Sequence, residues 1–60
     1  MKYYNILMSL AEIASENGNM YAITDYAFGY IPFKNGENMV QKVGHDFLDI
    51  AQWLLNEMKN

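Results

Sequence analysis

Residues 20–33 have the sequence MYAITDYAFGYIPF, and the conformation of this stretch decides the fold. The stretch contains no Leu, Glu, Gln or Arg, and it is rich in Tyr, Ile, Thr and Phe, which favour a pleated surface. Asp25 and Gly29 suit a short turn, because an Asp side chain can cap turn amides and Gly accepts positive φ. We therefore predict an antiparallel hairpin whose turn lies between these two residues.

The predicted turn also sets the register of the two strands. One face of the hairpin is expected to carry the pairs Thr24–Ile31 and Ala22–Phe33, and the other face the pairs Tyr21–Lys34 and Asp25–Tyr30. Proline cannot donate a hydrogen bond to a neighbouring strand. Pro32 therefore predicts that the second strand lies at an edge of the sheet.

An alternative conformation of the same stretch is a helix. Met20, Ile23, Ala27 and Tyr30 recur at the spacing of one helical face. With this segment helical, the chain would form an all-α three-helix bundle.

Helices are predicted on both sides of the hairpin. Residues 2–16 form an amphipathic pattern that ends at the Asn-Gly-Asn sequence of residues 17–19, where glycine can close a helix. A turn over residues 34–38 is followed by a predicted long helix over residues 38–58, with Asn38 as its capping residue. Its apolar stripe comprises Val40, Val43, Phe47, Ile50, Leu54 and Met58. The prediction is one α+β domain, residues 1–60, in α-β-β-α order: two helices around a short antiparallel hairpin.

Composition excludes several classes of protein. The 60 residues include seven acidic residues, four lysines and no arginine, for a net charge of −3, and they include no cysteine. Disulfides and thiolate metal sites are therefore excluded, and without a basic stripe nucleic-acid binding is disfavoured. The apolar run near the start is short and contains Asn5, so we do not interpret it as a signal peptide. Nothing approaches the roughly 18 apolar residues of a membrane span. We expect a cytoplasmic protein that does not bind a membrane.

Catalytic and metal-binding groups are scarce in the sequence. The single histidine, His45, stands four residues before Asp49 on the predicted helix, and we interpret the two as a solvated pair. Asp46 follows His45 directly, and adjacent helical residues diverge by about 100°, so the two would not point at one ion. Catalytic, metal and cofactor-binding residues are accordingly predicted to be absent, and the protein is not expected to be an enzyme.

The last predicted helix carries a second apolar stripe beside the first. It consists of Gly44, Leu48, Ala51 and Leu55. A helix with two apolar flanks must bury both, and a chain this short has few elements to cover them. We predict that this second stripe mediates self-association, giving a homodimer. The alternative is that the first helix covers one flank and the hairpin covers the other.

Aromatic residues outside these stripes predict a surface for another protein. On a helical wheel, Trp53 lies among acidic residues, and Trp is common at binding hot spots. The alternative is that Trp53 packs over the edge of the hairpin. The aromatics of the hairpin cannot all be buried, because tyrosine hydroxyls need partners inside a core. The predicted partner-binding residues are Trp53, Asp46, Asp49, Glu57, Tyr26, Phe28 and Tyr30.

The sequence therefore predicts a small acidic inhibitor or adaptor that occludes a site on a larger cytoplasmic protein. Bacteriophages and mobile elements often encode proteins of this description. Two alternatives remain: a helix-turn-helix DNA-binding regulator, which needs residues 20–31 to be helical, and a structural subunit of a homo-oligomer.

Overall fold

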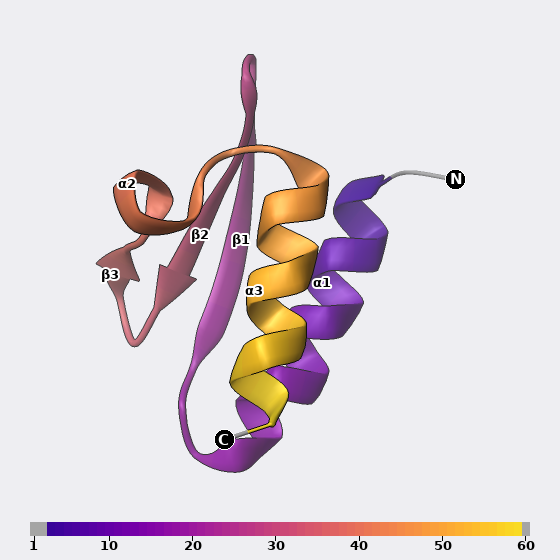
Figure 1. The fold of residues 1–60 in the computed structure, drawn as a ribbon, viewed down its shortest axis with the longest axis vertical. Helices are drawn as coiled ribbons and strands as arrows, with labels where there is room; N and C mark the ends of the chain where they lie inside the picture. The colour runs from indigo at the N-terminus through magenta and orange to yellow at the C-terminus, as the bar shows by residue number, and fades with distance from the viewer. Residues whose placement is uncertain (1–2, 60) are drawn as a thin grey trace.

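The structure is a computed structural model that describes residues 3–59. Two helices, α1 and α3, lie side by side on one face of a three-stranded antiparallel sheet of order β1-β2-β3 (Figure 1). The elements in chain order are α1 (Tyr3–Ala14), the 3-10 turn η1 (Ser15–Asn17), β1 (Tyr21–Tyr26), β2 (Gly29–Lys34), β3 (Glu37–Asn38), α2 (Val40–Val43) and α3 (Phe47–Met58). The predicted α+β class is confirmed, and the three-helix alternative is not supported, because residues 21–34 form strands.

The hairpin forms in the predicted register. β1 and β2 pair as predicted: Tyr21–Lys34, Ala22–Phe33, Thr24–Ile31 and Asp25–Tyr30. Gly29 adopts a φ of 144° where the chain leaves the turn, a value that side chains rarely allow. One face of the sheet is buried by the helices. The core contains Leu7, Ala11, Ala14, Tyr21, Ile23, Ile50 and Leu54.

The prediction that Pro32 makes β2 an edge strand is wrong, because β2 is the central strand. β3 has only two residues, and they pair with Phe33 and Lys34, so the nitrogen of Pro32 is not required in that ladder. The carbonyl of Pro32 instead accepts a hydrogen bond of 2.8 Å from the N–H of Met39. A proline is therefore accommodated in a central strand whose second neighbour is short.

The predicted long helix over residues 38–58 is also wrong, because the chain leaves the helical path after Val43. Gly44 adopts a φ of 109°, and Asp46 is extended, so α2 is a single turn and α3 begins at Phe47. A Cβ atom on Gly44 would lie 3.1 Å from the Asp49 carboxylate, which indicates how closely α3 approaches this bend. The predicted capping box of Asn38 does not form, because the N-cap residue of α2 is Met39, which makes no side-chain capping hydrogen bond. The side-chain oxygen of Asn38 instead accepts from the N–H of Val40 at 2.9 Å.

The helices α1 and α3 run parallel. Their first residues meet, with the rings of Tyr3 and Phe47 4.8 Å apart. At the other end, the side chain of Asn17 donates a hydrogen bond to the carbonyl of Met58 at 3.4 Å. Figure 1 shows both helices descending from the end of the molecule where the hairpin turn lies. The outer sides of the two helices consequently form one continuous surface opposite the sheet.

Candidate interaction surfaces

The residues predicted to bind a partner occupy two different environments. Trp53 and Glu57 of α3 and Tyr30 of β2 lie where the helices pack on the sheet, and all three are partly buried. Tyr26, Phe28, Asp46 and Asp49 are exposed. The structure therefore divides the predicted set into an internal packing group and an exposed group.

The internal group joins α3 to the hairpin. The Glu57 carboxylate lies 2.8 Å from the Lys34 ammonium and accepts a hydrogen bond from the Tyr21 hydroxyl. The edge of the Trp53 ring system contacts the Tyr21 ring, with centroids 5.5 Å apart. Trp53 thus covers the sheet, as a packing residue does.

The electrostatics of this group follow from its hydrogen bonds. The Lys34 ammonium, and after it the Tyr21 hydroxyl, hold the pKa of Glu57 below its ordinary value. Burial, together with the neighbouring Glu57 carboxylate, raises the pKa of Tyr21. The hydrogen bond to Glu57 raises the pKa of Lys34. All three shifts favour the ionisation states that keep the ion pair and the hydrogen bond intact at neutral pH.

Tyr30 also belongs to the packed interior. Its ring stacks on that of Tyr4 with centroids 6.4 Å apart, and its N–H donates to the carbonyl of His45 at 3.0 Å. The Tyr4 hydroxyl in turn donates to the carbonyl of Ile23 at 3.3 Å. Tyr30 therefore connects the hairpin to both α1 and the segment that precedes α3.

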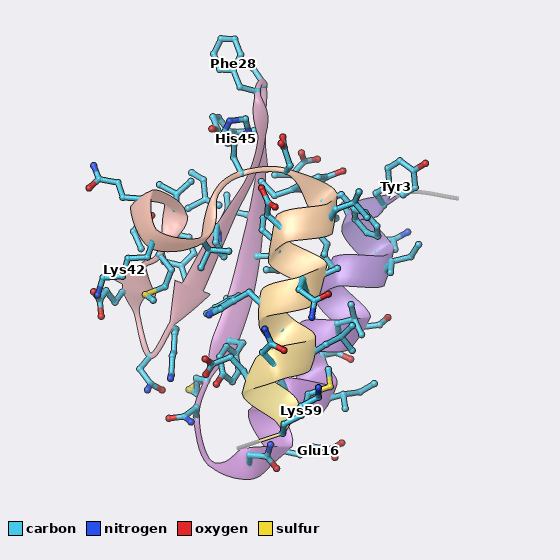
Figure 2. All side chains as sticks on the ribbon, in the orientation of Figure 1. Tyr3, Glu16, Phe28, Lys42, His45 and Lys59 are labelled. Carbon is cyan, nitrogen blue, oxygen red and sulfur yellow. The ribbon has the colours of Figure 1, made fainter. Side chains whose placement is uncertain are left out.

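The exposed group gathers at one end of the molecule. Phe28 is 79% exposed at the tip of the hairpin, and its ring packs edge to face with the Tyr26 ring, with ring centroids 6.1 Å apart. Figure 2 shows Phe28 at the outermost point of the hairpin with His45 directly beneath it. The base of the turn is held tightly, because a Cβ atom on Gly29 would lie 2.5 Å from the His45 carbonyl oxygen.

Acidic side chains lie on the elements next to this tip. Asp25 lies in β1 just before the turn, and Asp46 and Asp49 lie at the beginning of α3, which follows His45. The surface beside them is hollowed and is lined by Tyr3, Asp46, Phe47, Leu48 and Asp49. We call the set Asp25, Tyr26, Phe28, Asp46 and Asp49 the hairpin-tip end. It combines exposed aromatic rings with carboxylates.

The residues predicted for self-association are placed differently from one another. Gly44 lies in the bend before α3, where Asp49 of the same chain approaches it, so it does not belong to a stripe on that helix. Ala51 is half-buried and packs on the core. Leu48 and Leu55 are exposed on α3. Ile13, which is exposed on α1, was not among the predicted residues. A helical wheel drawn for one helix does not show which residues of another helix lie beside it.

The structure offers little reactive chemistry among the residues it describes. His45 lies before α3, so its predicted approach to Asp49 at helical spacing does not occur. It pairs instead with Asp46 at 3.4 Å. Within residues 3–59, no group of three or more His, Cys, Asp or Glu side chains is arranged to hold a metal ion. None of the helices in this range is long and apolar enough to cross a membrane.

Comparisons with protein-family models, with curated proteins and with solved structures found no match to this chain.

Proposed function

We propose that this chain is a non-enzymatic protein-binding protein of the cytoplasm, which docks its hairpin-tip end onto a larger protein as an inhibitor or adaptor. The observation that carries the proposal is the position of Phe28. Its ring is 79% exposed at the outermost point of the hairpin. Large aromatic side chains are common anchors at protein interfaces, where they fill a pocket of the partner.

The support beneath Phe28 suits a binding role. The turn joins two strands that are paired along their whole length, and Gly29 at its base lies against the backbone of His45. A ring presented on a rigid support loses little conformational freedom on binding, which favours affinity. Phe28 therefore resembles a pre-positioned anchor more than a mobile loop residue.

The charge around the tip indicates the kind of surface that a partner would present. Asp25, Asp46 and Asp49 lie at the same end of the molecule as the exposed rings, while Lys34 and Lys42 pair with glutamates elsewhere. A complementary surface would place basic side chains around an apolar pocket, and such charge complementarity speeds association. The proposed partner is thus a protein with a basic rim around a hydrophobic cleft.

The experiment is photo-crosslinking from position 28 in the native host, followed by binding measurements with the captured protein. Phe28→Ala should weaken binding at least tenfold, because an anchor contact is worth more than about 1.4 kcal/mol. Met20→Ala is the matched control, since Met20 is 74% exposed outside the hairpin-tip end. Circular dichroism should show both variants folded. Equal affinities of the two variants would contradict the proposal.

The DNA-binding alternative loses its structural premise. A helix-turn-helix protein of this length would need a helix over residues 20–31, and these residues belong to β1, the turn and β2. No observation specifically favours this alternative.

A further inference from the structure

The outer side of the helix pair carries an exposed apolar surface. On α1, Tyr4 bonds to β1, as does Ser15 of η1 directly after the helix, and Tyr3 contacts α3, so the remaining side faces away from both. On α3, Trp53 and Glu57 face the hairpin in the same way. With about 100° between successive helical residues, the outward positions follow directly. They are Ile6, Ser9 and Ile13 on α1 and Leu48, Gln52 and Leu55 on α3, which we call the outer helix face; Leu10 and Ala51 instead pack against the core.

The apolar content of this face is unusual for its position. A helix that packs one side on a sheet normally presents polar side chains on the opposite side. Here Leu48 is 75% exposed, Ile13 52% and Leu55 45%. Because α1 and α3 are parallel neighbours, these side chains belong to one surface. Contiguous exposed apolar surface of this kind marks an interface.

We propose that the outer helix face binds a second copy of this chain, in an antiparallel two-fold dimer. The first argument is charge. Each copy carries a net charge of −3, so two copies repel each other through most of their surfaces. All six residues of the outer helix face are uncharged. Two copies can meet there without burying a carboxylate, which would be costly without a partner.

The second argument concerns orientation. Asp46 and Asp49 lie at the beginning of α3, whereas Lys59 follows its end, about 18 Å away for twelve helical residues. Figure 2 shows Lys59 and Glu16 together at the end far from the hairpin tip, so that end is nearly neutral. An antiparallel pair places each Lys59 end beside the acidic end of the other copy. A parallel pair would place the two acidic ends together.

The dimer would affect how the proposed function works, although the dimer proposal does not depend on that function. Both hairpin tips would point away from the dimer, in opposite directions. One dimer would then present two equivalent docking ends and could bridge two partner molecules.

Sedimentation velocity over a concentration series tests the dimer. The wild-type chain should sediment as a dimer at high concentration, and Leu55→Glu should raise the dissociation constant by at least tenfold. Leu48→Glu provides a second variant, and Met20→Glu is its control, because Met20 and Leu48 are 74% and 75% exposed. Circular dichroism verifies the fold of each variant. A wild-type chain that remains monomeric at 1 mM, or a Met20→Glu variant that dissociates as readily as Leu48→Glu, would overturn the proposal.

Disulfide trapping tests the orientation, and the absence of cysteine from the chain makes it specific. Position 52 lies between positions 48 and 55, near the proposed two-fold axis. Gln52→Cys should crosslink to itself. Leu48→Cys should crosslink to Leu55→Cys in a mixture of the two proteins, and only weakly to itself. Efficient self-crosslinking of Leu48→Cys, with no mixed product, would show that the antiparallel arrangement is wrong.

Discussion

The carboxylate of Glu57, in the last turn of α3, lies 2.8 Å from the ammonium of Lys34, the last residue of β2. The same carboxylate accepts the hydroxyl hydrogen of Tyr21, which belongs to the core. Three residues from distant parts of the sequence thus form one polar contact between the helix layer and the sheet. The Glu57 side chain is only 18% exposed, so solvent screens this contact less than it screens a surface ion pair.

The first prediction concerns the pH dependence of folding. The pKa of Glu57 is lower in the folded chain than its ordinary value, so its carboxylate stabilises the fold above the unfolded-state pKa. That contribution is lost as the pH falls through the folded-state pKa. Glu57→Gln should therefore lower the free energy of unfolding by roughly 1 kcal/mol at pH 7 and by much less at pH 3. Urea unfolding at a series of pH values measures the difference.

Glu37→Gln provides the control for this experiment. Glu37 pairs with Lys42 at 3.9 Å, and both side chains are largely exposed. Its substitution should change stability by less than about 0.5 kcal/mol at either pH. A pH-independent loss in Glu57→Gln would show that the residue acts through packing and not through its charge.

The hairpin was predictable because its determinants are local. Strand-favouring residues on both sides of a short turn with a glycine leave few possible registers, and the pairing of Ala22 with Phe33 follows from that turn alone. The edge position predicted for β2 was wrong because the strand on its other side has no local determinants in the sequence. The third strand comes from residues 37–38, which carry no strand pattern, and two residues are too few to show a periodicity.

The helix break and the role of Trp53 depend on tertiary contacts. The apolar stripe continues from Val40 to Met58 with helical spacing, so periodicity alone gives no sign that Gly44 bends the chain. A helical wheel likewise places Trp53 among polar residues. It cannot show that Tyr21 lies opposite, because that contact joins segments 32 residues apart. Of the predicted partner-binding residues, Tyr26, Phe28, Asp46 and Asp49 are exposed, whereas Tyr30, Trp53 and Glu57 are partly buried.

A second prediction tests how the hairpin tip is held. Gly29→Ala places a methyl group 2.5 Å from the His45 carbonyl oxygen and also strains a φ of 144°. Gly36→Ala shares the positive φ but meets no atom within 4 Å. We expect Gly29→Ala to destabilise the fold by about 1–2 kcal/mol more than Gly36→Ala. Thermal unfolding of both variants measures the difference, and equal losses would mean that the contact with His45 is not tight.

A third prediction separates packing residues from surface residues among the aromatics. Trp53→Ala should cost about 3 kcal/mol, because it removes a ring that packs on Tyr21 and the core. Phe28→Ala should change stability by less than about 0.5 kcal/mol, because that ring lies mostly in solvent. Denaturant titration followed by circular dichroism measures both values. Were Phe28→Ala the more destabilising, the tip would be part of the core and unsuited to docking.

The last prediction concerns the edge of β1 that does not pair with β2, where Ser15 of η1 supplies a hydrogen-bond partner. The Ser15 hydroxyl accepts the N–H of Tyr21 at 3.0 Å and donates to the carbonyl of Ala11 at 2.7 Å. Ser15→Ala leaves the Tyr21 amide without this acceptor, which should cost about 1–2 kcal/mol. Hydrogen exchange of that amide, followed by NMR, should accelerate at least tenfold, whereas the exposed Ser9→Ala should leave it unchanged. An unprotected strand edge also invites pairing between chains, so Ser15→Ala should aggregate faster on heating. Unchanged exchange at Tyr21 would mean that another group protects the edge.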